Sequence, residues 1–435
     1  MSRPVEFPPS LWAAATPARE PAPALEGAIE ADVVVIGGGF SGLSTALELA
    51  RRGRSVTLLE AQAVGWGASG RNNGQVIPTM SAAEPEAIVA RYGETGERFV
   101  RLIADSADVL FRLAEAENID CEAEQTGWFQ PAHSPGRIRL SEKRVEAWRR
   151  YGAPAELLDR EASTRLLGSD FWHGGMFNRT GGHINPLALA RGLADACVRR
   201  GVVIFERTPV TGYARSGDGW KIETERGSVT ASAVVLATNA YTDERVPGLA
   251  PRMSRTIVPI LSWQMATAPL GDNLRRTILP GRQAVSDTRG DLRFFRYDAR
   301  NRLITGGAVL GPWRAAERVK EIVAGRMAEA FPEMGRPEIS HVWSGRVGIT
   351  RDRFPHLHRL GPDFWAWTGC NGRGVALSVS LGRELAAVVD GGRIGDLALP
   401  VTEPEPIPLH GLVRHVAPAM LAWYRRRDKV EPRLN

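Results

Sequence analysis

The sequence of 435 residues is poor in lysine and cysteine and has no long apolar run. No stretch approaches the roughly 20 apolar residues of a membrane-spanning helix, so we expect no membrane span. The cysteines, Cys121, Cys197 and Cys370, are odd in number and far apart, which argues against a disulfide framework and a paired-cysteine metal site. We therefore expect free thiols, no bound metal and a reducing compartment.

The sequence also lacks a secretory signal and a basic cluster. Prolines interrupt the first 27 residues where a signal would need an apolar core, which predicts an irregular surface arm and a cytoplasmic protein. The net charge of +6 comes from 55 basic and 49 acidic residues spread along the chain. Because nucleic-acid binding requires a basic patch, we expect no nucleic-acid partner.

A dinucleotide-binding pattern lies near the N-terminus. The string ADVVVIGGGFSGLSTALELARRGRSVTLLEA predicts a strand, a glycine turn, a helix and a second strand. Gly37 permits the sharp turn, Gly39 lets the backbone approach a pyrophosphate, and Gly42 lets the helix lie close to the strand. Glu60 ends the second strand, where a carboxylate can accept hydrogen bonds from a ribose diol. This pattern alone leaves both FAD and NAD open.

An unusual loop follows the second strand. The stretch VGWGASGRNNGQV holds four glycines, three side-chain amides and one arginine, with no hydrophobic face. A simple NAD-binding unit would continue directly into its next helix or strand. This loop can instead press its backbone against a flat ring with polar edges, which favours a flavin.

With these motifs the sequence resembles the D-amino-acid oxidase superfamily of FAD enzymes, in its glycine/sarcosine oxidase and gamma-glutamylputrescine oxidase-like branch. The resemblance runs from residue 31 to about 390 and rests on the fingerprint ending at Glu60, GASGRNNGQ, VVLATNAYT, and WSGRVGITRDRFP followed by GCNGRGVALSVSLGRELA. It implies an FAD-dependent oxidation of a C–N bond by hydride transfer to flavin N5. The segment SGRVGIT lacks the cysteine that attaches the flavin in some relatives, so we expect non-covalent FAD.

The resemblance and the strand pattern together predict an α/β protein, α+β overall. A Rossmann-type FAD-binding domain is expected to interleave with a substrate domain built on a mixed, mainly antiparallel β-sheet. The expected boundaries are 1–30 for an N-terminal arm, 31–80, 150–245 and 341–400 for the FAD-binding domain, 81–149 and 246–340 for the substrate-binding domain, and 401–435 for a C-terminal helical tail.

Cofactor contacts are implied by the same resemblance. In the family, the loop after the second strand contacts the pyrophosphate and the isoalloxazine, and the start of the last helix lies beside the flavin, where its dipole can stabilise an anionic ring. The residues implied in FAD binding are Gly37, Gly39, Phe40, Ser41, Gly42, Glu60, Ala61, Ser69, Gly70, Arg71, Asn72, Asn73, Gly74, Gln75, Val210, Thr238, Asn239, Gly345, Gly372, Arg373, Gly374 and Val375.

Four side chains are candidates for substrate contact. Arg296, at the end of LRFFRY, can bind a carboxylate or be a solvated strand end. His183, in TGGHINP, can position an amine or cap a helix. Trp263, in PILSWQM, can wall the pocket or pack in the core. Arg346 stands one place earlier than the arginine of the Gly-x-Arg-Pro motif that amino-acid oxidases of the superfamily carry, and the proline is absent.

This departure favours an amine, or an amino acid with a distal amine, over a simple α-amino acid. The alternatives are a secondary amine or cyclic imino acid such as sarcosine, proline or pipecolate and, from another class, a non-catalytic flavin-binding regulatory protein. Sarcosine-oxidase-like relatives use a lysine near the flavin to assist oxygen, but none occurs here between Lys221 and Lys320. The electron acceptor can therefore be oxygen or another molecule.

Overall fold

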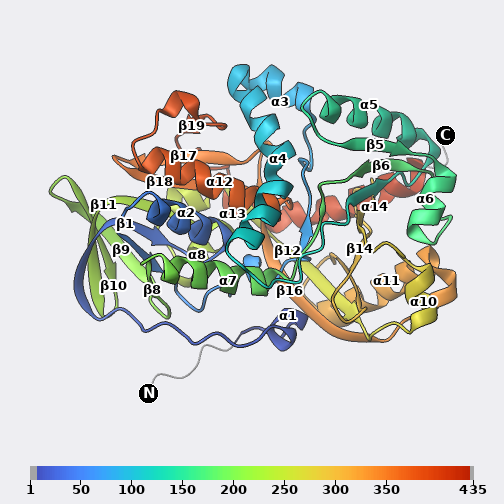
Figure 1. The fold of residues 1–435 in the computed structure, drawn as a ribbon, viewed down its shortest axis with the longest axis horizontal. Helices are drawn as coiled ribbons and strands as arrows, with labels where there is room; N and C mark the ends of the chain where they lie inside the picture. The colour runs from blue at the N-terminus through green and yellow to red at the C-terminus, as the bar shows by residue number, and fades with distance from the viewer. Residues whose placement is uncertain (1–6, 432–435) are drawn as a thin grey trace.

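The computed structural model describes residues 7–431, and its first β-sheet has nine strands (Figure 1). These are β1 (Gly27–Ile36), β2 (Val56–Leu59), β8 (Val203–Phe205), β9 (Val210–Ser216), β10 (Gly219–Thr224), β11 (Gly227–Leu236), β17 (His356–Gly361), β18 (Phe364–Thr368) and β19 (Val401–Thr402). The main path is β19-β17-β18-β11-β1-β2-β8, and β10 and β9 extend from β11. Strands β18, β11, β1, β2 and β8 pair in parallel, as in a nucleotide-binding sheet.

The two faces of β1 are buried against different partners. Val33 and Val35 pack among helices, whereas Val34 and Ile36 pack with the β9–β10 hairpin. Because side chains alternate across a strand, a continuous apolar run suits a strand that is covered on both sides. The helices on the first face are α2 (Phe40–Arg51), α4 (Glu94–Ala116), α7 (Pro186–Arg199) and α12 (Gly374–Val389).

The second sheet has eight strands. They are β4 (Trp128–Pro131), β5 (Ala155–Leu158), β6 (Gly175–Asn178), β12 (Ile257–Thr267), β13 (Ala284–Ser286), β14 (Phe294–Tyr297), β15 (Leu303–Gly307) and β16 (Ile339–Thr350). Their order is β16-β12-β15-β14-β13-β4-β6-β5, and of these neighbouring pairs only β13 and β4 run parallel. The mixed, mainly antiparallel sheet is thus confirmed. Helix α11 (Ala315–Ala330) packs on its core.

The two sheets interleave along the chain, but their boundaries differ from those predicted. Strands β5 and β6 belong to the second sheet, although 150–245 was assigned to the FAD-binding domain. Strand β16 also lies in the second sheet, because it pairs with β12 along its whole length. Helix α4, within 81–149, packs against α12 of the first sheet's helical layer. Short apolar strands carry no local marker of the sheet that they join.

The N-terminal arm is less superficial than predicted. It contains α1 (Leu11–Ala15), whose Leu11 and Trp12 are fully buried in a cluster with Trp343. The indole N–H of Trp12 donates to the carbonyl of Asn72, 2.9 Å away. The segment Leu11–Ala15 therefore packs against the glycine-rich loop, whereas most of residues 17–26 are exposed or half-buried, as expected of a surface arm.

The remaining elements are short connections and the C-terminal helices. They are β3 (Gln75–Val76), β7 (Gly182–His183), α3 (Pro85–Tyr92), α5 (Ile138–Arg149), α6 (Arg160–Leu167), α8 (Thr242–Arg245), α9 (Pro251–Ser254), α10 (Asp272–Thr277), α13 (His410–Val416), α14 (Met420–Val430) and the 3-10 turns Ala68–Gly70, Pro135–Arg137, Asn239–Tyr241, Pro332–Met334, Ile394–Asp396 and Ala417–Ala419. The helical tail is present as predicted but begins after β19, which joins the first sheet.

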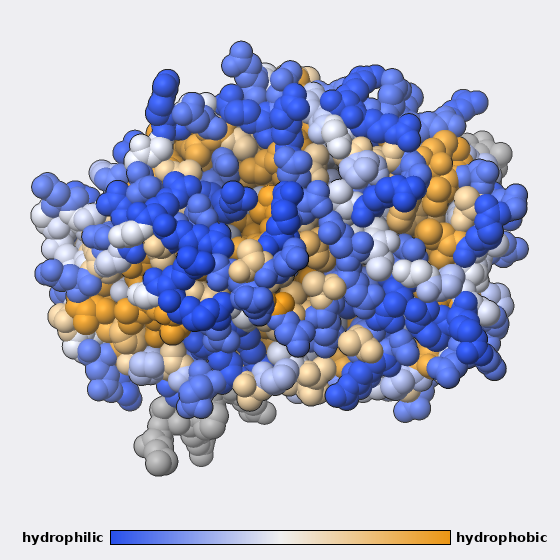
Figure 2. Space-filling model, viewed as in Figure 1, coloured by the Kyte–Doolittle hydropathy of each residue, from blue (hydrophilic) through white to orange (hydrophobic). Residues whose placement is uncertain are grey.

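Hydrophilic residues cover most of the face shown in Figure 2, and apolar residues show between them in separate areas. Within residues 7–431, no helix is both long enough and apolar enough to cross a membrane. The same range holds no group of three His, Cys, Asp or Glu side chains that could bind a metal ion. Cys121, Cys197 and Cys370 are free thiols.

Candidate functional site

One large cavity is lined by residues from both sheets. At one end lie the turn after β1, the end of β2 and the start of β9. The glycine-rich loop, the turn after β11 and the first residues of α12 form its middle. Strands β12, β13, β14 and β16 contribute the far wall. The cavity thus joins the dinucleotide fingerprint to the second sheet.

The three fingerprint glycines have no room for side chains. Gly37 has a φ of +114°, and a Cβ there would lie 2.9 Å from the carbonyl oxygen of Ala237. A Cβ on Gly39 would lie 2.8 Å from the hydroxyl oxygen of Ser69. A Cβ on Gly42 would lie 2.0 Å from the carbonyl oxygen of Gly37, so this glycine allows close helix packing and does not itself line the cavity. The positive φ of Gly37 and the close helix packing at Gly42 agree with the roles predicted from the motif, whereas the approach of a pyrophosphate to Gly39 stays a prediction.

Backbone groups fix the carboxylate at the end of β2. Glu60 Oε2 accepts a hydrogen bond from the N–H of Gly38 at 2.7 Å, and Oε1 accepts one from the N–H of Gln62 at 2.9 Å. Ala61 and Val210 line the cavity beside it. A carboxylate held in this way can receive hydrogen bonds from a diol and disfavours a phosphate at the same place.

The N-terminus of α2 faces the cavity. Phe40 and Ser41, its first residues, line the wall, so the positive end of the helix dipole is directed at any phosphate bound there. Ser69 from the glycine-rich loop accepts a hydrogen bond from the N–H of Phe40 at 3.0 Å. This hydrogen bond therefore connects the glycine-rich loop to the N-terminus of α2.

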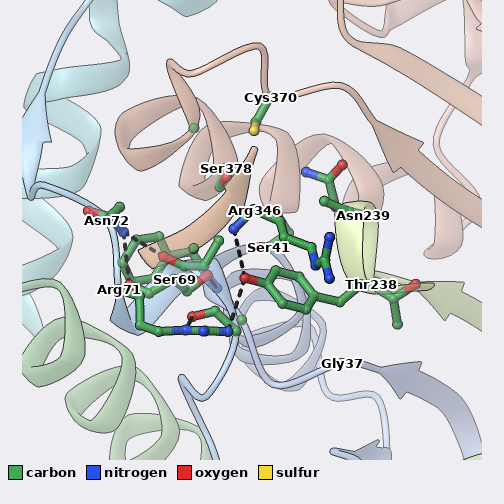
Figure 3. A pocket seen from close by; sticks show the side chains of 18 of the residues that line it. Gly37, Ser41, Ser69, Arg71, Asn72, Thr238, Asn239, Arg346, Cys370 and Ser378 are labelled. Atoms are coloured by element: carbon green, nitrogen blue, oxygen red, sulfur yellow. Dashed lines mark hydrogen bonds between the residues drawn. The ribbon is translucent and has the colours of Figure 1, made fainter. Parts of the chain in front are cut away.

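The amides of the loop hold its shape. Asn72 donates to the carbonyls of Ala68 and Ser69 and accepts from the N–H of Gly74 at 2.7 Å. Gln75 donates to the carbonyls of Val285 and Phe295 on the second sheet. Gly70 lies outside the cavity, in contrast to the predicted cofactor contact, because it packs on Gly65, whose carbonyl oxygen would be 2.2 Å from a Cβ. Figure 3 shows Ser69, Arg71 and Asn72 on one side of the cavity and Thr238 and Asn239 on the other.

Tyr241, which was not among the predicted site residues, connects the two sides of the cavity. The hydroxyl oxygen of Tyr241 accepts hydrogen bonds from Arg71 Nη2 at 3.0 Å and from the backbone N–H of Arg346 at 2.9 Å, drawn as dashes in Figure 3. Burial raises the pKa of Tyr241, so the phenol keeps its proton at neutral pH. Since the oxygen already accepts two hydrogen bonds, the hydroxyl is a donor toward the cavity. Arg71 also lies 4.7 Å over the ring of Trp66.

Arg346 lines the cavity, but its charge is already balanced. Its Nε lies 2.7 Å from Oε2 of Glu244, and both side chains are partly exposed. The start of α12 contributes Gly372, Arg373, Gly374 and Val375, and Gly345 lies on the adjoining strand. Asn239 adopts a φ of +42°, a conformation that asparagine tolerates.

Arg296 does not line the cavity, which corrects the expectation that it contacts the substrate. The side chain is 1% exposed, and its guanidinium donates to the carbonyls of Asn73, Ile184 and Tyr297. It also lies 4.7 Å over the ring of Trp12. Its position on β14 was predicted correctly, but these three carbonyls hold the guanidinium behind the glycine-rich loop.

His183 and Trp263 are likewise outside the cavity. His183 is 1% exposed, its Nε2 lies 2.9 Å from the carbonyl of Arg282, and burial lowers its pKa well below the ordinary value. Trp263 packs against the core of the second sheet, whereas its neighbours Ser262 and Gln264 line the cavity. Since side chains alternate along β12, the site faces those two residues and not the tryptophan.

Further wall residues were not predicted, although several lie within the quoted motifs, because a motif does not state which of its side chains face the cavity. A helical or strand pattern marks them as buried, but no spacing connects them. They are Ile77, Ser262, Gln264, Ser286, Leu292, Phe294, Val347, Cys370 and Ser378, together with Trp66 and Tyr241.

The residues present fit FAD. One end offers the glycine turn, the fixed carboxylate of Glu60 and the start of α2, as an ADP group requires. The middle offers loop backbone, the hydroxyl of Tyr241 and the start of α12, which suit a flat ring that becomes negatively charged. Ser262, Gln264 and Phe294 of the second sheet line another part of the cavity.

Comparison with known proteins agrees with this geometry. Residues 32–388 match the family described as FAD dependent oxidoreductase, DAO. The chain is 33% identical to gamma-glutamylputrescine oxidoreductase of Escherichia coli K12 over 88% of this chain and 89% of that protein. It is 32% identical to the probable oxidoreductase OrdL of Haemophilus influenzae over 83% of each. The crystal structure of glycine oxidase from Geobacillus kaustophilus has a TM-score of 0.70 at 22% identity, covering 84% of this chain and 96% of that one.

Proposed function

Since the chain belongs to the DAO family of FAD-dependent oxidoreductases, an enzyme family whose relatives act on amines and amino acids, we propose that it is a gamma-glutamylputrescine oxidase-like amine oxidoreductase. The substrate proposed is an amine, or an amino acid whose reacting amine is distant from its carboxylate. Bound FAD supplies the acceptor for a hydride from the carbon beside an unprotonated amine.

The observation that carries the proposal is the ion pair of Arg346 with Glu244. In this fold an arginine near this point of the strand would grip the carboxylate of an α-amino acid beside the reacting carbon. Here its Nε lies 2.7 Å from Glu244, so the charge is compensated before any substrate binds. Compensation at this point disfavours a substrate whose carboxylate adjoins the reacting carbon.

The rest of the wall suits an aliphatic amine. Ile77, Leu292 and Phe294 provide apolar surface for methylene groups. Gln264 accepts from the side-chain amide of Asn73 at 3.3 Å, and both side chains line the same part of the cavity. These walls exclude water and orient the reacting carbon, which is the contribution that this chemistry requires from the protein.

The proposal is tested by the visible absorbance of purified protein without oxygen. Gamma-glutamylputrescine, putrescine, glycine, sarcosine, proline and pipecolate are added in turn. We expect gamma-glutamylputrescine to bleach the flavin at the lowest concentration. Bleaching by sarcosine, proline or pipecolate alone would replace the proposal with a secondary-amine or imino-acid enzyme. Release of the yellow colour on denaturing precipitation would establish that FAD is bound non-covalently.

The same sample identifies the electron acceptor. None of the four lysines, Lys143, Lys221, Lys320 and Lys429, lines the cavity, so no lysine is available there to assist oxygen. Either an arginine or histidine takes the place of the lysine, or the acceptor is a molecule other than oxygen. Admitting air to the bleached enzyme, in parallel with an anaerobic quinone or dye, compares the two rates of colour return. Faster return in air would identify an oxidase.

A further inference from the structure

Arg373 is a cation on the cavity wall without a partner in the protein. It lies between two glycines at the start of α12 and lines the cavity. Among residues 7–431 its side chain forms no hydrogen bond or ion pair, and its Nε is buried without an acceptor. Its guanidinium lies 5.4 Å over the ring of Trp128, which fixes its place. The residue is half-buried, and a charge that is partly withdrawn from water normally has a hydrogen-bonding partner, so the side chain can take one from a bound molecule.

The surrounding charges leave this region positive. Arg144 repels Arg373 electrostatically, and Glu84 is the nearby acid. However, Oε1 of Glu84 lies 2.7 Å from Nε of Arg144, and Oε2 accepts from the indole N–H of Trp148. The carboxylate of Glu84 is therefore committed to other groups. Burial lowers the pKa of Arg373 to about 9, which still leaves the guanidinium charged at neutral pH.

A second donor, the hydroxyl of Ser286, lies at the edge of the Trp128 ring. The hydroxyl oxygen of Ser286 accepts a hydrogen bond from the indole N–H of Trp128 at 2.8 Å. Ser286 also lines the cavity, and the described residues offer no acceptor for its hydroxyl proton. One indole thus carries Arg373 over its face and Ser286 at its edge. Apolar side chains, Leu292 and Phe294, line the cavity nearby.

We propose that Arg373, assisted by the hydroxyl of Ser286, binds a carboxylate at the end of the substrate that does not react. This inference rests on the proposed function and specifies its substrate class: an amine joined through an aliphatic chain to an anionic group. A guanidinium and a hydroxyl together match the two oxygens of a carboxylate. The arginine used here comes from the last helix and not from the strand that carries Arg346.

The resemblance assigns Arg373 to the cofactor, and the experiment separates the two assignments. The variants are Arg373→Met, Arg373→Lys and, as a matched control, Arg359→Met. Arg359 also lies over an indole, 5.5 Å above Trp365, but it is exposed and outside the cavity. For each purified holoenzyme, FAD content and melting temperature are measured first. Anaerobic bleaching then gives the half-saturating concentrations of gamma-glutamylputrescine, which has a carboxylate, and putrescine, which has none.

A binding measurement independent of turnover completes the test. Glutarate, a dicarboxylate that has no amine to oxidise, is titrated while the visible spectrum of the bound flavin is followed. In Arg373→Met we expect the half-saturating concentrations of glutarate and gamma-glutamylputrescine to rise about 10- to 100-fold, as loss of a charged hydrogen bond implies. Putrescine should change less than about threefold, and Arg373→Lys should recover part of the loss. The control should match the wild type.

Three results would overturn the inference. Loss of FAD from both Arg373 variants would show that the side chain holds the cofactor. Equal effects on putrescine and gamma-glutamylputrescine would show that no carboxylate is involved. A glutarate titration that is unchanged in Arg373→Met would also show that Arg373 does not bind a carboxylate. If neither amine bleaches the wild type, the proposed function fails, and the glutarate titration alone then decides the role of Arg373.

Discussion

The two ends of the cavity are built in different ways. At the nucleotide end, Gly37, Gly39 and the carboxylate of Glu60 line the wall, and all three lie within a short span of the sequence. In the middle of the cavity and at the proposed substrate end, isolated side chains such as Tyr241, Ser286 and Arg373 come from separate elements. The difference teaches that binding through the backbone leaves a local motif, whereas binding through side chains depends on tertiary packing.

Replacing a glycine at the nucleotide end is expected to have the largest effect. In Gly42→Val the new Cβ would lie 2.0 Å from the carbonyl oxygen of Gly37, and neither backbone can move without separating α2 from β1. We expect loss of FAD and destabilisation by more than about 4 kcal/mol, measured by flavin content and denaturant unfolding.

The control for this prediction is Gly411→Ala in α13, where no atom lies within 4 Å of the added Cβ. It should stabilise the helix slightly, by at most about 1 kcal/mol. Retention of FAD by Gly42→Val would show that close helix packing is not what the third glycine provides.

The second largest effect is expected at Arg296, which holds the glycine-rich loop from outside the cavity. In Arg296→Met the carbonyls of Asn73, Ile184 and Tyr297 lose their donor inside the protein. Each unsatisfied buried carbonyl costs about 1–3 kcal/mol, so we expect a loss of about 3 kcal/mol or more in unfolding free energy and weaker FAD binding. Arg300→Met, an exposed arginine in the turn after β14, is the control. If Arg296→Met had normal stability but a higher half-saturating concentration of gamma-glutamylputrescine, Arg296 would instead be a substrate-binding residue.

These two ends also explain how far the sequence could predict the site. The fingerprint was predictable because its turn, helix and strand are consecutive in the sequence. Each glycine is needed where a side chain would clash with neighbouring residues of the same unit. Trp263 was placed on the correct strand, but the choice between pocket wall and core stayed open, since a strand pattern does not state which face meets a ligand. Arg373 was assigned through its glycines, and only the folded chain shows its unpaired guanidinium. Tyr241 lies two residues after Asn239, in a motif whose predicted contacts are made by backbone groups. The motif therefore gave no reason to select the tyrosine side chain.

Removing one hydroxyl tests the middle of the cavity. In Tyr241→Phe, Arg71 and the N–H of Arg346 lose a shared acceptor, and the cavity loses a donor. We expect FAD to remain bound while the rate of flavin reduction falls about 10-fold, the effect of one lost hydrogen bond of 1–2 kcal/mol. Tyr213→Phe is the control, because Tyr213 packs through its ring against Phe364 away from the cavity. An unchanged rate would limit Tyr241 to a structural role.

The smallest effect is expected at Arg346, and it separates the two arginines of the substrate end. The side chains of Arg346 and Glu244 are 38% and 29% exposed, so their ion pair contributes less than about 1 kcal/mol to stability. Arg346→Met should therefore change the half-saturating concentration of gamma-glutamylputrescine by less than about threefold. Glu244→Gln, which releases the guanidinium, should improve binding of α-amino acids if the ion pair is what excludes them. A 10-fold loss of gamma-glutamylputrescine binding in Arg346→Met would instead place the carboxylate on this strand and remove the need for Arg373.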